Sequence, residues 1–228
     1  MHSRIILLIV LLLFTGNLEV NGQVNEGKVY LSGENPGIRL MSEEGADPTT
    51  SVSFWRILWS PVGMGHVLWI DSDITGDGPS SDDVRAAFTD NWALPDHMIR
   101  EVLGTFDKSY YDNPYEQRMA RFEQAALTWM PVSGSDAQQT LTEWKEMVTS
   151  EDHTIELVWK DFYPAFQLDI HNGSSERLPF GITSLFIPAR SADVVVNGET
   201  AVGQPYPQMQ GTAESSTAFL AFSESWIK

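Results

Sequence analysis

The sequence contains no cysteine. This excludes disulfide bonds, thiolate metal sites and cysteine nucleophiles within the chain. The fold must therefore be held together by apolar burial, and a chain of 228 residues is long enough to bury a large core.

Basic residues are also scarce. The chain has 14 lysines and arginines against 31 aspartates and glutamates, which gives a formal net charge of −17. Such a charge repels a polyanion, so we expect no nucleic-acid partner. The excess of acidic residues is explained by solubility of the protein in water. The alternative explanation is that some of the carboxylates bind a divalent cation.

Long apolar runs are missing except near the N-terminus, where Ile5 to Phe14 form ten consecutive apolar residues. As a helix this run spans only about 15 Å, roughly half of a bilayer core, so we expect no transmembrane anchor. Arg4 before the run, and Val20 and Gly22 at the −3 and −1 positions of a cleavage site before Gln23, predict a signal peptide over residues 1–22. We therefore expect residues 23–228 to be a single β-rich domain that is secreted or periplasmic, with an uncleaved anchor as the alternative.

Alternation of apolar and polar residues dominates the rest of the chain. Val52 to Trp59, a glycine-rich turn and His66 to Asp71 predict a central hairpin, and Asn197-Gly198 predicts a second, two-residue hairpin. Residues 52–59 are apolar on both faces, which is typical of a strand covered on two sides. Thr140 to Val148 fits a helix or a strand, and the turn residues after it favour a strand.

Helical spacing is confined to one part of the chain. It predicts two short helices between residues 92 and 124, the first entered at Leu94-Pro95 and the second at Asn113-Pro114. The predicted fold is therefore mainly β: a single antiparallel β-barrel or a two-sheet sandwich of about ten strands with these two helices inserted.

Carboxylates are concentrated in the loop that follows Asp71. Asp71, Asp73, Asp77 and Asp82 are separated by glycine turns, as in loops that offer several oxygen ligands to calcium. Ca²⁺ is therefore the one cofactor that the sequence suggests, in a calcium-stabilised surface or carbohydrate-interaction module. A solvated hairpin loop without metal is the competing interpretation.

Local signatures of catalysis are missing. The histidines form no pair with zinc-ligand spacing, and the chain has no Gly-x-Ser-x-Gly motif. His66, beside a glycine-rich turn, and the carboxylate of Asp90 remain as candidate acid–base residues. They define one function hypothesis, a secreted hydrolase or isomerase.

Tryptophans are unusually frequent in the predicted strands. Trp55, Trp59 and Trp69 lie in the central hairpin with His66 and Arg56, and aromatic walls are used to bind flat apolar ligands and sugar rings. The leading hypothesis is therefore an exported, non-catalytic protein that holds a small, partly apolar molecule or a carbohydrate in an aromatic-lined cavity. Packing of these rings in the core is the alternative interpretation.

Overall fold

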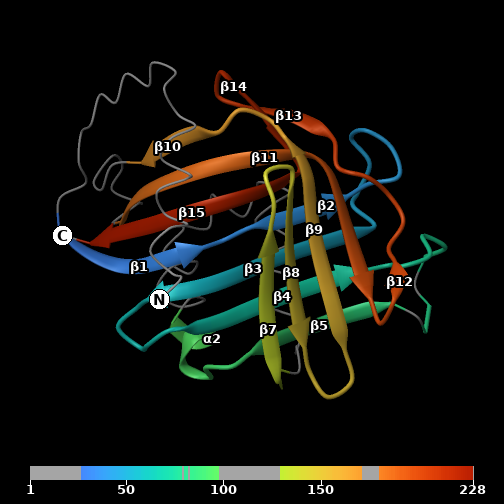
Figure 1. Ribbon diagram of the computed structural model, residues 1–228, viewed down its shortest axis with the longest axis horizontal. Coiled ribbons are helices and arrows are strands. Elements are labelled where there is room, and N and C mark those ends of the chain that lie inside the picture. Colours follow the sequence, from blue (N-terminus) through green and yellow to red (C-terminus); the bar gives the residue numbers. More distant parts are fainter. Residues whose placement is uncertain (1–26, 79, 82, 98–128, 171–179, 228) are drawn as a thin grey trace.

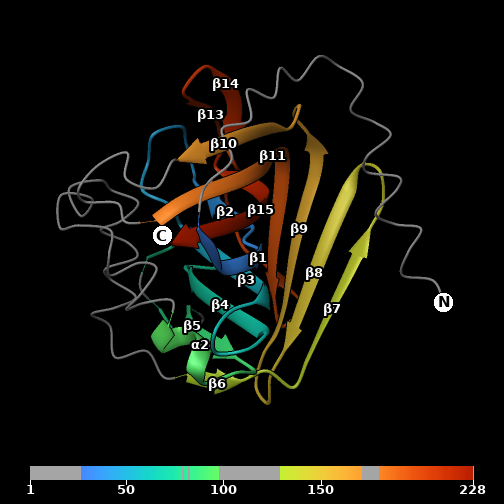
Figure 2. The ribbon, with the colours of Figure 1, turned by 90° about the vertical axis from the view of Figure 1, so that its left-hand side faces the viewer.

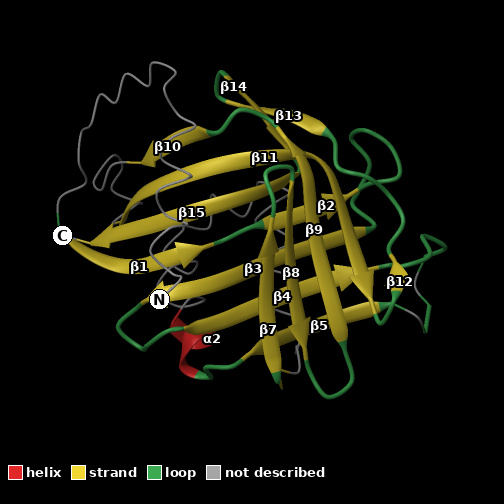
Figure 3. Cartoon of the chain, in the orientation of Figure 1, coloured by secondary structure: helices red, strands yellow, loops and turns green. Residues whose placement is uncertain are grey.

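A computed structural model describes residues 27–78, 80–81, 83–97, 129–170 and 180–227. Within these ranges the protein is mainly β, with fifteen strands and one short helix (Figure 3). The strands are β1 (Lys28–Glu34), β2 (Gly37–Leu40), β3 (Thr50–Trp59), β4 (Gly65–Ser72), β5 (Val84–Thr89), β6 (Trp129–Pro131), β7 (Gly134–Gln139), β8 (Glu143–Thr149), β9 (Thr154–Phe162), β10 (Phe166–Ile170), β11 (Phe180–Val196), β12 (Glu199–Thr200), β13 (Pro207–Gln210), β14 (Ala213–Ser216) and β15 (Ala218–Ile227). The helix is α2 (Ala93–His97).

Thirteen of the strands form one continuous sheet in the order β6-β5-β4-β3-β1-β15-β11-β9-β8-β7. β2 pairs with β3 and β15, β10 and β12 pair with β11, and β13 and β14 form a separate two-stranded sheet. Strand β11 connects two layers, because Phe180–Pro188 pair with β15 whereas Ala189–Val196 pair with β9. Figures 1 and 2 show the result: a small layer of β7, β8, β9 and the second half of β11 crosses one face of a large layer that contains β1 to β5 and β15.

The two end strands of this path, β6 and β7, are joined by Val132 and Ser133. The amide of Val132 donates to the carbonyl of Thr89 in the large layer, and the amide of Ser133 donates to that of Thr149 in the small layer. Within the described residues no ladder pairs β6 with β7, so the sheet is folded over on itself and is not a closed barrel.

All pairings of the sheet are antiparallel except that of β5 with β6, which is parallel over three residue pairs. The chain segment between these two strands runs from residue 90 to residue 128, which is long enough for a crossover. The antiparallel order that we predicted from short connections is therefore confirmed elsewhere in the sheet and fails where the connection is long.

Two apolar clusters lie on opposite faces of the large layer. The inner cluster fills the space between the layers and includes Phe54, Leu68 and Trp159, whose indole N–H donates to the carbonyl of Gly37 at 3.1 Å. The outer cluster lies on the face turned away from the small layer and consists of Leu31, Ile57, Val67, Trp69, Ala87 and Leu94. Strand β3 contributes to both clusters, which confirms that it is covered on two sides.

Local sequence patterns located most of the strands. All but the last residue of β8 lies within the segment 140–148, as the strand interpretation required, and Asn197 and Gly198 turn β11 into β12 with φ angles of 53° and 88°. Strand β7 was not predicted, because all six of its residues are exposed and they show no apolar alternation. Of the two predicted helices only the start of the first, α2, can be compared, because residues 98–128 lie outside the described part of the chain, as does the predicted signal peptide.

Candidate functional site

A polar network lies between the two layers, centred on Arg56 of β3. Arg56 faces Glu34 of β1 on one side and His66 of β4 on the other in the strand register, so the three side chains share the inner face of the large layer. The Arg56 Nη1 atom lies 2.7 Å from a Glu34 carboxylate oxygen, and its Nε–H donates to His66 Nε2 at 3.3 Å. One guanidinium therefore connects three neighbouring strands.

The small layer contributes Glu146, from β8, to the same network. Its carboxylate accepts a hydrogen bond from Arg56 Nη2 at 2.5 Å and another from the indole N–H of Trp144 at 2.7 Å. The Glu146 side chain is fully buried. Burial raises its pKa from 4.5 to about 7, against the opposing effect of the Arg56 charge. This carboxyl group therefore titrates near neutral pH while it holds the two layers together.

His66 is fixed by the carboxylate of Asp90, which follows β5. One Asp90 oxygen lies 2.6 Å from His66 Nδ1, and the other accepts the backbone N–H of His66 at 2.6 Å. Because Arg56 donates to Nε2, that nitrogen is the acceptor and Nδ1 carries the proton in the neutral ring. The hydroxyl of Ser135, from β7, lies 3.2 Å from the same Nε2 atom.

The loop that carries Asp90 is held close to the turn between β3 and β4. The side-chain amide of Asn91 donates to the carbonyls of Val62 and Met64 at 3.2 and 3.0 Å. A Cβ atom at Gly65 would lie 2.5 Å from the Asp90 carboxylate, so only glycine permits this approach. The glycine-rich turn before His66 therefore lets the Asp90 carboxylate come close enough to bind His66.

The structure separates the candidate binding and catalytic residues of the hairpin region into two groups. It brings Arg56, His66 and Asp90 together on the inner face. The predicted tryptophans lie on the outer face: Trp69 is buried in the outer cluster, Trp55 packs against that cluster, and Trp59 is half exposed. Successive residues of a strand point to opposite faces, which is why adjacent Trp55 and Arg56 have different surroundings. A ligand-binding role for the three tryptophans stays a prediction.

The acidic loop after β4 is tied to its own backbone. The two carboxylate oxygens of Asp73 accept the amides of Gly76 and Gly78 at 2.7 and 3.0 Å, and a carboxylate oxygen of Asp71 lies 3.5 Å from an Arg85 nitrogen. Asp77 is exposed, and Asp82 is not among the described residues. No group of three potential ligands for a metal ion occurs in the described part of the chain. Calcium binding stays a prediction, which a melting experiment with a chelator would test.

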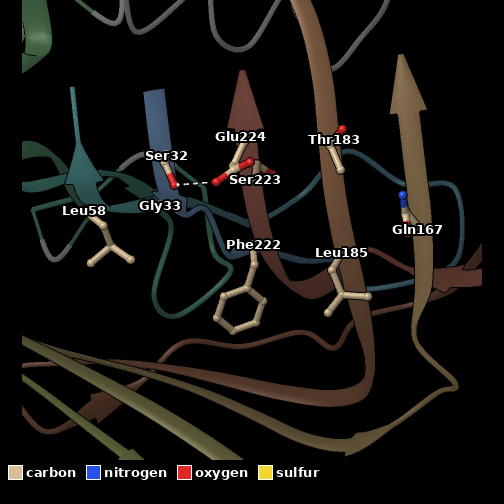
Figure 4. Close-up of a pocket in the computed structure, with 9 residues that line it drawn as sticks. All are labelled: Ser32, Gly33, Leu58, Gln167, Thr183, Leu185, Phe222, Ser223 and Glu224. Carbon is tan, nitrogen blue, oxygen red and sulfur yellow. Dashed lines mark hydrogen bonds between the residues drawn. The ribbon is translucent and has the colours of Figure 1, made fainter. Parts of the chain in front are cut away.

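A pocket of about 310 Å³ lies on the inner face of the large layer. Apolar side chains from three strands line it, together with hydroxyl, amide and carboxylate groups: Leu58, Leu185 and Phe222, and Ser32, Gln167, Thr183, Ser223 and Glu224, with Gly33 (Figure 4). The strand register places Phe222 opposite both Glu34 and Leu185, so this pocket adjoins the Arg56 network. The Trp144 ring contacts the Phe222 ring edge-on at 5.9 Å and links the two.

Sequence reasoning missed Glu146, Ser135 and the pocket residues. Glu146 had a usable signal, since it shares one strand face with Trp144 and Val148 and a lone acid on an apolar face needs a partner. Ser135 had none, because it lies in a polar segment. The pocket residues were assigned to strands, and alternation alone cannot show which part of an inner face is left uncovered.

Comparisons with known proteins assign no role to these residues. No model of a known protein family matches the chain, and no curated protein matches it. Within the described ranges, none of the helical structure has the length and apolar character needed to cross a bilayer.

Proposed function

We propose that this protein binds a small, partly apolar ligand in the pocket on the inner face of its large layer. The observation that carries this proposal is the mixed lining of the pocket, in which Leu58, Leu185 and Phe222 offer apolar contacts beside Gln167 and Glu224. Small-molecule sites are concave, mostly apolar and supplied with a few polar groups that orient the ligand. A volume of about 310 Å³ is at the lower end of the range for such sites, so it suits a compact molecule.

The charges at the pocket limit the chemistry of this ligand. The exposed carboxylate of Glu224, which accepts the Ser32 hydroxyl at 3.4 Å, is the ionic group of the lining. Together with the net charge of −17 it disfavours an anionic ligand. We therefore propose a neutral or cationic molecule, with a ring or short alkyl part against Phe222 and hydroxyl or amino groups toward Gln167 and Glu224. A sugar or an aromatic amine has this character.

The aromatic wall of this pocket differs from the one expected from the sequence. Phe222 forms part of the lining, and Trp144 stands behind it at 5.9 Å between their ring centroids. Trp55, Trp59 and Trp69 are on the other face of the sheet, so their substitution is not expected to alter binding in this pocket directly.

The test is a screen by ligand-observed NMR with neutral and cationic fragments: monosaccharides, aromatic alcohols and aromatic amines. Leu185→Trp fills the pocket, and Leu141→Trp makes the same exchange at an exposed position outside the lining. A pocket ligand should lose about tenfold or more in affinity with Leu185→Trp and should be unaffected by Leu141→Trp. A screen that finds no binder sensitive to Leu185→Trp would overturn the proposal.

A further inference from the structure

We propose that Ser135, His66 and Asp90 form a second site that hydrolyses small esters, with Ser135 as the nucleophile. None of the three residues lines the pocket, so this inference is independent of ligand binding there. The three residues come from different parts of the sheet: Ser135 from edge strand β7 of the small layer, His66 from β4, and Asp90 from the end of β5 in the large layer. Folding the sheet over on itself brings them together.

The geometry is that of a nucleophile, a base and a group that orients the base. Ser135 Oγ lies 3.2 Å from His66 Nε2, and Asp90 Oδ2 lies 2.6 Å from His66 Nδ1. These contacts leave Nε2 free of a proton in the neutral ring, which is the form that can accept one from a hydroxyl. Such an arrangement is recognised by its geometry and roles and not by sequence position.

The base is held at both its ring and its backbone. Asp90 binds the ring Nδ1 and the backbone N–H of His66, while the Thr89 hydroxyl donates to the His66 carbonyl at 2.8 Å. The Phe54 ring stacks on the imidazole with centroids 6.0 Å apart and an angle of 10°. A base that cannot turn away from the serine is what proton transfer between them requires.

Arg56 has two opposing effects on catalysis at this site. Its Nε–H donates to the Nε2 lone pair that the serine hydroxyl must use, so the serine has to displace this bond before the histidine can take its proton. Its positive charge, with Nε 3.3 Å from the nitrogen that Ser135 also contacts, would stabilise negative charge that develops near Ser135 during attack on an ester. The Glu34 and Glu146 carboxylates hold the guanidinium there.

The reaction needs water as its only co-reactant. Ser135 Oγ attacks the carbonyl carbon of the ester and its proton passes to His66 Nε2. The bond from that carbon to the alkoxy oxygen then breaks, the same proton passes to the leaving alcohol, and the acyl group remains on Ser135. Water attacks this acyl group, gives a proton to His66, and releases the carboxylic acid as the proton returns to Ser135.

The surroundings of Ser135 indicate the class of substrate. Ser135 is exposed on a strand whose six residues are all exposed, so an acyl group can approach from solvent. The carboxylates of Glu34 and Glu146 pair with the Arg56 guanidinium, and a third carboxylate, that of Asp90, pairs with His66. We therefore assign neutral or cationic esters with a small acyl group.

The experiment uses p-nitrophenyl acetate for turnover and a fluorophosphonate for covalent labelling, with the modified residue identified by mass spectrometry. The purified protein should hydrolyse the ester and carry the label on Ser135. Ser135→Ala should abolish the label and lower turnover about 100-fold, and Asp90→Asn should lower turnover about tenfold or more. Because the Ser135 side chain is exposed, its removal leaves the fold intact, which circular dichroism checks.

The matched control is Ser133→Ala, two residues earlier, whose hydroxyl donates to the Thr149 carbonyl and does not contact His66. Its turnover and labelling should equal those of the unaltered protein. Absence of label at Ser135, or full turnover in Ser135→Ala, overturns the proposal.

Discussion

The two faces of β3 differ in the forces that hold them. On the outer face Ile57 belongs to an apolar cluster and Trp55 packs against it. On the inner face Phe54 joins the core, but Arg56 beside it binds two carboxylates and a histidine. Both faces are stabilised by burial of apolar area, and the inner face in addition holds paired charges in a place that water reaches poorly.

This difference separates two signals that look alike in a strand. A tryptophan on an apolar face is explained by packing, as Trp69 shows. A charged residue on an apolar face has to be paired, and its partners then gather other polar groups around it, as Arg56 does with Glu146 and His66. In the central hairpin, Arg56 therefore indicated where the polar network lies, whereas the tryptophans did not.

The largest expected effect is on the outer face. Trp69→Ala removes a fully buried ring and should lower the free energy of unfolding by about 3–5 kcal/mol, because it leaves a cavity in the outer cluster. Trp59→Ala, on the same face but 49% exposed, should cost about 1 kcal/mol. Urea unfolding followed by circular dichroism measures both. Equal losses for the two variants would show that the outer cluster is not the packed region described above.

On the inner face, Arg56→Met should lower stability by about 3 kcal/mol at pH 8, because it leaves Glu146 buried and without its cation. The loss should be smaller at pH 5, where Glu146 carries a proton, since its pKa is raised to about 7. Arg85→Met, which removes a half-exposed cation 3.5 Å from Asp71, is the control and should cost less than about 1 kcal/mol at either pH. A loss that is the same at both pH values would contradict this account.

The smallest effect is the pH dependence of the unaltered protein. The pKa of Glu146 is higher in the folded chain than in the unfolded one, so folding favours the protonated carboxyl group. The stability that this group contributes is complete below pH 4.5 and is lost as the pH rises through about 7. We expect unfolding free energy to fall by on the order of 2 kcal/mol from this group. Glu146→Gln should flatten the profile between pH 5 and 8, whereas Glu143→Gln, on the same strand, should leave it unchanged. A profile that keeps its slope in Glu146→Gln would assign the dependence to another group.

Much of the strand content could be predicted from the sequence, because alternation and turn residues act over a few positions. The hairpin at Asn197-Gly198 and the two-sided burial of β3 were both visible in this way. The layer arrangement was not, because it depends on β11 changing partners at Pro188 and Ala189. Local patterns indicate where a strand runs, but they do not show which neighbouring strand each part of it pairs with.

The candidate site was predicted in part. His66, Asp90 and Arg56 were named from one stretch of chain, and the structure brings them together because β3, β4 and the end of β5 are neighbours. Glu146 lies 90 residues after Arg56 in the sequence, and Ser135 lies 69 residues after His66. Both nevertheless contact the group in the structure. Contacts over such separations follow from the packing of whole layers, which no spacing rule describes.

The sequence by itself determined the strand-rich character of the chain, its acidity and the absence of thiol chemistry. Each of these follows from composition or from patterns only a few residues long. The tertiary structure alone decided which face of β3 received Glu146, and it alone placed Ser135 beside His66. The physical reason is that a side chain's chemistry is set by what the fold packs against it, and its partners here are distant in the chain.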